Sequence, residues 1–303
     1  MIQHRVVPYW SRKQLSDGIT KSKKGRDRHA MIKAQLNNLM RIAAVLAVFG
    51  LTGGHALAGG LVEIEFNAGD FTAMGNDPLD IDNRWWPLQA GTRFVYFAEN
   101  EDDECLMNEV VVTDATKFVA AGVLARVVED KEWIDLDGVC DTTFDGLPND
   151  VVLEDTDDWY AQDYSGNIWY LGEDTTEYLY DEDWNLLGTS EEGAWEAGAD
   201  VAGTGMNAEA GIVMLAAPTT GDYYRQEFYE DEAEDMGKVL TFPAFVATEL
   251  QDYDGCVKTK EWTRLSPGEN EHKYYCRDIG LVLIEELKGK TVIVEAIIVN
   301  IAP

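Results

Sequence analysis

Between residues 59 and 303 the sequence shows almost no helical periodicity, which restricts this chain to a β-sheet fold. Short alternating or β-branched and aromatic segments recur between Gly, Asp, Asn and Pro residues. The clearest hairpin pairs residues 157–162 with 167–171, and the apolar segment 291–299 is expected to be a central or covered strand. Because no Pro/Ser-rich linker divides 59–303, we predict one all-β domain. It would be an antiparallel meander forming a strongly curved sheet or half-barrel, with short helical turns at most.

Residues 31–58 have the pattern of a secretory signal peptide. Lys33 and Arg41 are positively charged, residues 42–51 are apolar, and residues 56–58 form an A-x-A cleavage signal. The apolar segment is shorter than the roughly 20 residues that span a bilayer. We therefore predict cleavage before Gly59, export to the periplasm or the extracellular space, and no transmembrane anchor after cleavage.

Residues 1–30 precede this signal and are basic and polar. Signal peptides seldom follow such an extension, so we interpret 1–30 as sequence upstream of a true start at Met31. The alternative is an unusually long positively charged n-region. Neither interpretation places 1–58 in the folded product.

The part of the chain after residue 58 is strongly acidic. It has 14 Lys and Arg residues against 54 Asp and Glu residues, a formal charge of −40, and His272 is its one histidine. Nucleic acid and anionic membrane surfaces would be repelled, whereas a cation, a small ligand or an envelope component is compatible with this charge. The favoured interpretation of the acids, including the block 230–235, is a solvated acidic surface.

Four cysteines lie after the predicted cleavage point, and an even number in an exported chain indicates two disulfides. We favour Cys105–Cys140 and Cys256–Cys276, because the second pair flanks a turn near 266–268. The two other pairings remain open. A zinc site is a weaker alternative, since no C-x-x-C spacing occurs.

An ordered series of motifs resembles a family of secreted bacterial proteins of unknown function. The resemblance covers about 80–290 and rests on segments that include DWYAQD (158–163), GNIWY (166–170), GAWEAG (193–198), YRQE (224–227), AEDM (233–236), KTKEW (258–262) and EHKYY (271–275). It implies export and a compact β-rich domain, and it brings no assigned activity or catalytic residues. The cysteines are not part of the family pattern.

A calcium site is one candidate function. Asp141, Thr143, Asp145 and Asn149 supply oxygen donors in a loop with Gly146 at the sixth position, as in an EF-hand. The twelfth position is a valine and no helices flank the loop, so the pattern is incomplete. The competing interpretation is that the Asp-Gly pairs are ordinary turns.

An aromatic surface is a second candidate. Trp159, Tyr160, Trp169 and Tyr170 alternate along two predicted strands, so one ring of each Trp-Tyr pair points to each face. One face would be core, and the other could stack against a sugar or an apolar ligand. Cross-strand pairing that only stabilises the sheet is the favoured interpretation.

Hydrolytic chemistry has little support in the sequence. The serines after residue 58 lie outside any G-x-S-x-G motif, there is one histidine, and no H-E-x-x-H occurs. A pair of catalytic carboxylates remains open, because the sequence cannot select two acids from 54. We therefore expect an exported, non-catalytic protein that binds Ca²⁺ or an apolar or sugar-like ligand. The alternatives are an extracytoplasmic carboxylate-pair hydrolase and a structural envelope-associated protein.

Overall fold

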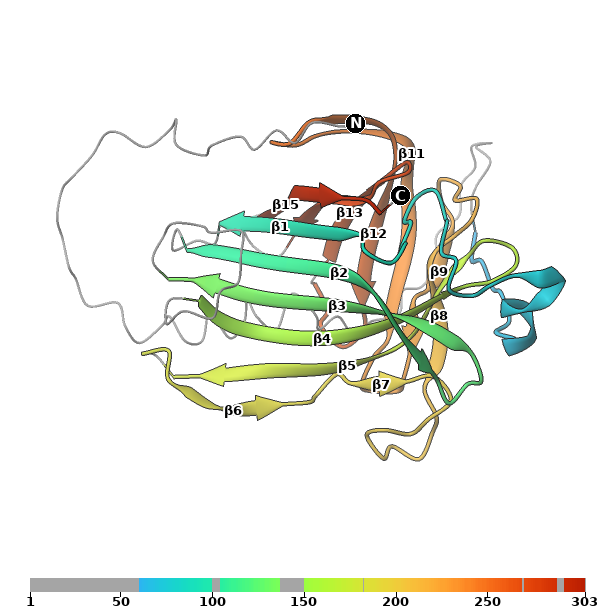
Figure 1. Cartoon of the computed structure of the whole chain (residues 1–303), viewed down its shortest axis with the longest axis horizontal. Helices are drawn as coiled ribbons and strands as arrows, with labels where there is room; N and C mark the ends of the chain where they lie inside the picture. Colours follow the sequence, from blue (N-terminus) through green and yellow to red (C-terminus); the bar gives the residue numbers. More distant parts are fainter. Residues whose placement is uncertain are drawn as a thin grey trace.

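Fifteen strands of one sheet make up most of the computed structural model, which describes residues 60–99, 104–136, 150–181, 183–268, 270–287 and 292–302 (Figure 1). The strands are β1 (Arg93–Glu99), β2 (Cys105–Phe118), β3 (Leu124–Asp135), β4 (Asp150–Gln162), β5 (Ile168–Tyr180), β6 (Leu186–Ser190), β7 (Trp195–Glu196), β8 (Glu209–Met214), β9 (Tyr223–Arg225), β10 (Glu227–Phe228), β11 (Asp235–Ala247), β12 (Asp252–Thr263), β13 (Asn270–Cys276), β14 (Gly280–Glu286) and β15 (Val292–Asn300). Two short 3₁₀ helices, η1 (Ala68–Phe71) and η2 (Ala73–Gly75), precede them.

The strand order explains how the sheet curves back on itself. The path runs β10-β8-β5-β4-β3-β2-β1-β15-β14-β13-β12-β11-β9, with β6 and β7 pairing with β5, and neighbouring strands are antiparallel. The end strands β9 and β10 are separated in sequence by Gln226 alone. Because consecutive residues lie at the two ends of the path, the chain itself draws the edges together into a nearly closed barrel.

Two halves of this curved sheet face each other. In Figure 1, β1 to β5 lie in front and β11 to β15 lie behind them. Side chains alternate between the interior and the exterior of the curve along each strand, as the strand period of two requires. The prediction of an all-β, antiparallel and strongly curved sheet is confirmed.

Residues 66–92 cover one end of the sheet. Asn76 and Asn83 donate side-chain hydrogen bonds to the backbone of the β4–β5 hairpin, at Gln162 O (2.9 Å) and Gly166 O (2.8 Å). The largest hydrophobic core forms beneath this segment, and its large buried members include Phe71, Ile81, Trp85, Trp159, Trp169 and Trp195.

The expected central position of the last strand is confirmed, because β15 lies between β1 and β14. The predicted Cys256–Cys276 disulfide is present and joins directly adjacent positions on β12 and β13. Cys105 is also disulfide-bonded, but its expected partner, Cys140, lies outside the described residues. Among the described residues, no helix has both the length and the apolar character needed to cross a bilayer.

Candidate functional site

Acidic side chains line the inner face of β3, β4 and β5. The strand register places Glu132 beside Glu154, and Asp158 beside Glu173. Between these two rows, Asp130 lies beside Thr156. Because these residues are two apart along their strands, they share the face that points into the curve.

The opposite half of the sheet contributes a second set of acids together with one lysine. Glu261 on β12 pairs with Glu271 on β13, which pairs with Glu286 on β14. Lys273 lies two residues further along β13, and its Nζ is 3.0 Å from Glu261 Oε2 and 3.2 Å from Glu271 Oε2. Lys273 is thus the cation to which these carboxylates are bound.

The two halves interact electrostatically across the interior. Glu286 and Glu271 contribute to the raised pKa of Glu132, and Asp235 contributes to the raised pKa of Glu173. Lys273 in turn lowers the pKa of Asp130, against the larger effect of burial. Residues far apart in sequence therefore form one interior cluster, which we call the carboxylate cluster. Its members are Asp130, Glu132, Glu154, Asp158, Glu173, Glu227, Asp235, Glu261, Glu271 and Glu286.

Burial keeps much of this cluster protonated near neutral pH. Burial raises the pKa of Asp158 to about 7, although the hydrogen bond from Tyr170 lowers it. Burial also raises the pKa of Asp235 to about 7, opposed by the charge of Lys273. The pKa of Glu286 is raised to about 8 by burial and by the nearby Glu271. For Glu227, burial and the charge of Asp235 raise the pKa well above its ordinary value.

For Lys273, the effect of neighbouring charges on the pKa exceeds the effect of burial. Burial lowers the pKa of Lys273, but the carboxylates of Glu261 and Glu271 outweigh it and hold that pKa well above its ordinary value. Lys273 therefore remains charged at any physiological pH. Deprotonation of the remaining acids as pH rises adds negative charge to the interior, which favours a further cation.

Hydroxyl groups orient several of these carboxylates. Tyr170 donates to Asp158 Oδ1 at 2.5 Å, and Thr259 donates to Glu261 Oε1 at 2.8 Å. On the β4 side, Thr156 donates to Glu154 Oε1 at 2.7 Å. The carboxylate cluster is thus held in place by neighbouring strands before any ligand binds.

Aromatic rings form a layer at the covered end of the cluster. Trp86 contacts Tyr160 on β4 (5.1 Å between centroids) and Tyr275 on β13 (5.8 Å), so it bridges the two halves of the sheet. Tyr160 stacks on Tyr170 at 4.9 Å, and Tyr170 meets the edge of Trp195 at 5.2 Å. A group held by the carboxylates would therefore have electron-rich rings next to it.

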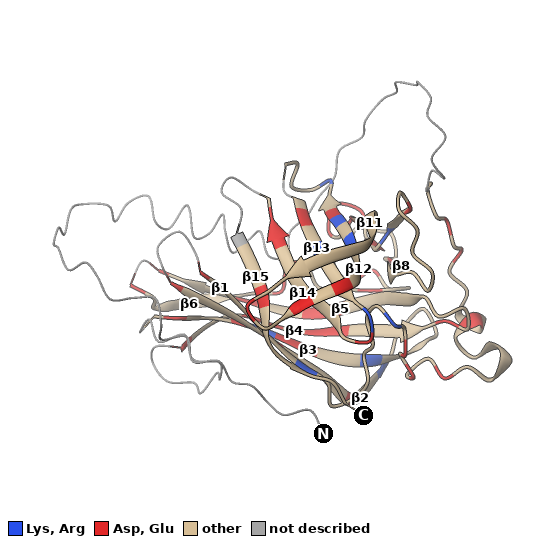
Figure 2. Ribbon diagram, turned by 90° about the horizontal axis from the view of Figure 1, so that it is seen from above, with Lys and Arg blue, Asp and Glu red and all other residues tan. Residues whose placement is uncertain are grey.

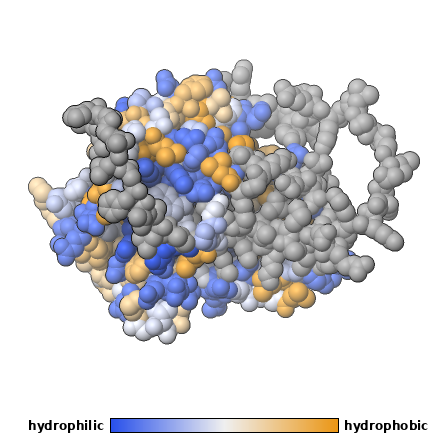
Figure 3. Space-filling model, turned by 180° about the vertical axis from the view of Figure 1, so that it is seen from behind, coloured by the Kyte–Doolittle hydropathy of each residue, from blue (hydrophilic) through white to orange (hydrophobic). Residues whose placement is uncertain are grey.

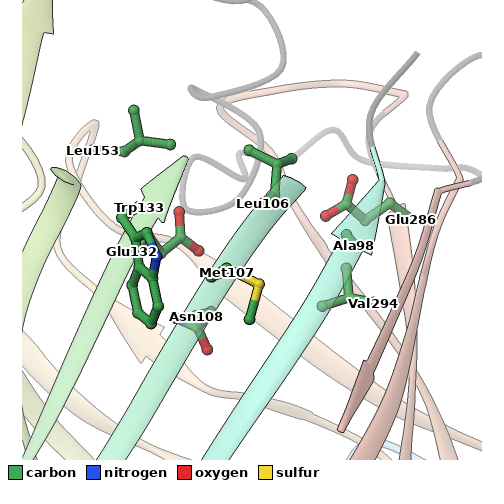
Figure 4. Close-up of a pocket in the computed structure, with 9 residues that line it drawn as sticks. All are labelled: Ala98, Leu106, Met107, Asn108, Glu132, Trp133, Leu153, Glu286 and Val294. Atoms are coloured by element: carbon green, nitrogen blue, oxygen red, sulfur yellow. The ribbon is translucent and has the colours of Figure 1, made fainter. Parts of the chain in front are cut away.

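The end of the cluster away from this aromatic layer carries a narrow pocket of about 20 Å³. Figure 4 shows Glu132 and Glu286 on opposite sides of it, with Leu106 and Met107 between them. A volume of about 10–15 Å³ is enough for one water molecule. The pocket therefore has room for a water molecule beside Glu132 and Glu286, within a lining that is mostly apolar.

The four aromatic residues singled out in the sequence lie on both faces of the β4–β5 hairpin. Tyr160 and Tyr170 belong to the interior layer. Trp169 is packed against Phe71 in the core and donates from Nε1 to Asp163 Oδ2 at 2.9 Å. Trp159 is buried, with Lys117 Nζ 4.4 Å from its ring centroid. The arrangement brings the two tyrosines to the candidate site and leaves the two tryptophans outside it.

The predicted calcium loop cannot be placed, because Asp141, Thr143, Asp145 and Asn149 lie outside the described residues. Among the residues that are described, no group of three or more His, Cys, Asp and Glu side chains is arranged to hold a metal ion.

The acidic block 230–235 is not uniformly solvated, and that interpretation is wrong for two of its members. Glu234 is buried and forms an ion pair with Arg264, and Asp235 points into the carboxylate cluster. The sequence did not indicate that Glu234 and Asp235 are buried, because a run of consecutive acids shows no alternation between buried and exposed positions. The alternation of side chains within 258–262 and 271–275 could have predicted that Glu261, Glu271 and Lys273 face the interior.

No family model and no curated protein matches the chain. A solved structure of a putative lipoprotein from Parabacteroides distasonis ATCC 8503 is similar over 72% of this chain and 99% of its own, at 10% sequence identity and a TM-score of 0.34.

Proposed function

We propose that this protein is an exported, non-catalytic binding protein that holds a small organic cation, such as a primary amine, in the carboxylate cluster. The signal-peptide pattern of 31–58 and the Cys256–Cys276 disulfide support export. The observation that carries the binding role is the convergence of acids from both halves of the sheet around one lysine, Lys273.

The side chains around the carboxylate cluster favour an organic cation over a metal ion. Tyr160, Tyr170, Tyr275 and Trp86 lie beside the acids, and aromatic faces attract organic ammonium groups. The pocket between Glu132 and Glu286 lies at the opposite end of the cluster from these rings and has room for a water molecule, so it supplies solvent to the acids at that end.

Thermal melts of the protein purified after export test this proposal. Ethanolamine, 1,4-diaminobutane, calcium chloride and sodium chloride are compared at matched ionic strength. A ligand that binds only the folded state must raise the melting temperature, so the amines are expected to raise it more than sodium chloride does. The Asp158→Asn/Glu173→Gln variant should lose this response, and Glu249→Gln, on the exposed surface, should keep it.

Other outcomes would reject the proposal in distinct ways. Stabilisation by calcium alone would point to a metal site. An equal effect of sodium chloride and the amines would mean that only charge screening is at work. A response that survives in the Asp158→Asn/Glu173→Gln variant would place amine binding elsewhere on the molecule.

A further inference from the structure

The outer face of β11, β12 and β13 carries a row of basic residues. Lys238 pairs directly with Lys260, and Lys260 pairs directly with His272. Gly237, Glu261 and Glu271 pair in the neighbouring register positions and face the interior, so the basic row faces outward. Figure 2 shows blue segments near the β11 and β12 labels, among strands that otherwise carry red segments.

The pairing of Lys238 with Lys260 is electrostatically unfavourable by itself. Like charges directly opposite each other on neighbouring strands destabilise a sheet. Within the described chain, neither lysine forms an ion pair, although acids outnumber bases 54 to 14 after residue 58. The adjacent Lys258 does have a partner, Glu285 at 2.8 Å. Two adjacent uncompensated lysines in such an acidic chain point to an anion supplied from outside.

Aromatic side chains flank this row. Lys260 Nζ lies 5.4 Å from the ring centroid of Trp262, which is two residues along β12 on the same face. Tyr223 on β9 pairs with Lys238. Both rings are half-buried, so part of each remains accessible. Figure 3 views the molecule from the side opposite to Figure 1 and shows hydrophilic side chains between hydrophobic patches.

The spacing and the overall charge limit the kind of anion. Neighbouring strands lie about 4.7–4.9 Å apart, so Lys238 and Lys260 present two charges at an interval close to the length of one sugar unit. His272 adds no such charge, because burial lowers its pKa and its Nδ1 contacts Glu285 at 3.1 Å. A charge of −40 would repel a broad anionic surface such as a membrane or a nucleic-acid duplex. A single polymer chain that contacts only the basic row would avoid most of that repulsion, because it lies against few of the acids. Trp262 and Tyr223 would contact the apolar faces of sugar rings.

We propose that the outer face of β11–β13 binds a linear polysaccharide with carboxylates on its sugar units, through Lys238, Lys260 and the rings of Trp262 and Tyr223. This site lies on the opposite face of the strands from the carboxylate cluster, and it does not depend on the function proposed for that cluster.

Calorimetric titration of the purified protein with polygalacturonate tests this inference, with neutral dextran, linear polyphosphate and anionic phosphatidylglycerol vesicles as comparators. We expect binding of polygalacturonate that weakens as salt increases, and no binding of dextran. The Lys238→Gln/Lys260→Gln variant should bind at least about tenfold more weakly, which corresponds to about 1.4 kcal/mol. Trp262→Ala should also weaken binding.

Controls keep this test independent of folding. Lys131→Gln removes a lysine of β3 that is ion-paired to Asp155 of β4, and it should leave binding unchanged. The double variant removes a repulsive pair, so its melting temperature should equal or exceed that of the wild type. Absence of polygalacturonate binding, or unchanged affinity in the double variant, would overturn the proposal. Equal binding of polyphosphate would overturn the assignment to a sugar chain, and preferential binding of the vesicles would assign the face to a lipid surface instead.

Discussion

The hydroxyl of Tyr170 donates a 2.5 Å hydrogen bond to Oδ1 of Asp158 across the β4–β5 pair. Two opposing effects meet at this contact. Burial favours the neutral carboxyl and raises the pKa of Asp158, whereas the hydrogen bond favours the carboxylate and holds that pKa to about 7. The pKa of Tyr170 itself is raised well above its ordinary value by burial and by Asp158, so the hydroxyl remains a donor. Asp158 is therefore poised to change charge near neutral pH.

Replacing Tyr170 with phenylalanine should push the pKa of Asp158 above about 7. At pH 8 the carboxylate would lose its donor, and we expect stability to fall by about 1.5–3 kcal/mol, as for hydrogen bonds to charged groups. At pH 5 the loss should be smaller, because Asp158 is protonated. Urea denaturation at both pH values and NMR titration of Asp158 measure these effects. Tyr164→Phe, at an exposed position, is the control, and an equal loss at both pH values would contradict this account.

The carboxylate cluster should make the protein most stable in mild acid. The folded-state pKa values of Asp158 and Asp235 are about 7, and that of Glu286 is about 8, all above the values of about 4 expected in the unfolded chain. Between pH 4 and 8 the folded state therefore holds more protons than the unfolded state, so stability decreases as pH rises through this range.

Urea midpoints at pH 5, 7 and 9, at constant ionic strength, check this direction. General repulsion in an acidic chain would act in the same direction, so variants are needed to separate the two causes. The Asp158→Asn/Asp235→Asn variant should show a shallower decrease between pH 5 and 9 than the wild type. The exposed pair Glu209→Gln/Glu249→Gln should change that slope less. Greater stability at pH 9 than at pH 5 would refute the prediction.

Lys273→Met should destabilise the protein strongly at neutral pH. It would leave the buried carboxylates of Glu261 and Glu271 without their cation, and breaking a buried pair in this way costs about 3–5 kcal/mol. The loss should shrink at pH 5, because the freed carboxyls then take up protons. Lys131→Met is the matched control: its ion pair with Asp155 is exposed, and exposed pairs contribute about 0–1 kcal/mol. Equal effects of the two substitutions would show that the interior pair has no special role.

The sheet was predictable because its signals are local. Alternation and turn residues defined the β4–β5 hairpin, and the apolar character of 291–299 placed β15 in the middle of the sheet. The closure of the sheet was not predictable in this way. It depends on Gln226 separating β9 from β10, two very short strands that pair with β11 and β8 at opposite ends of the strand path, and no local pattern encodes that geometry.

The candidate site was less predictable than the fold. Alternation could indicate that Tyr160 faces away from Trp159, but it could not indicate which face would be enclosed. The approach of Asp130 to Lys273, and of Glu173 to Asp235, depends on the two halves of the sheet facing each other. The 54 acids after residue 58 favoured the prediction of a solvated surface. In the structure, the alternation of side chains along the strands directs some of these acids into the interior.

Removal of the Cys256–Cys276 disulfide by substituting both cysteines with alanine should lower the free energy of unfolding by about 3 kcal/mol. The cysteines are 20 residues apart, and a cross-link of that loop length restricts the unfolded chain by about this amount. Thermal and urea denaturation of the double variant measure the loss. The single Cys256→Ala variant, in which the cross-link is also absent, should lose nearly as much. A decrease below about 1 kcal/mol in the double variant would show that β12 and β13 need no cross-link.

Gly211→Ala should disrupt the closure of the sheet. A Cβ at this position on β8 would lie 2.3 Å from the backbone carbonyl carbon of Gln226, the residue that links β9 to β10. Backbone atoms cannot move aside as a flexible side chain can, so we expect a loss of at least about 1–3 kcal/mol. Gly188→Ala on β6 is the matched control, because a Cβ there meets no atom within 4 Å, and it should leave stability nearly unchanged. Hydrogen exchange should show faster opening of β8 to β10 in Gly211→Ala, and equal exchange in the two variants would mean that this contact does not hold the sheet closed.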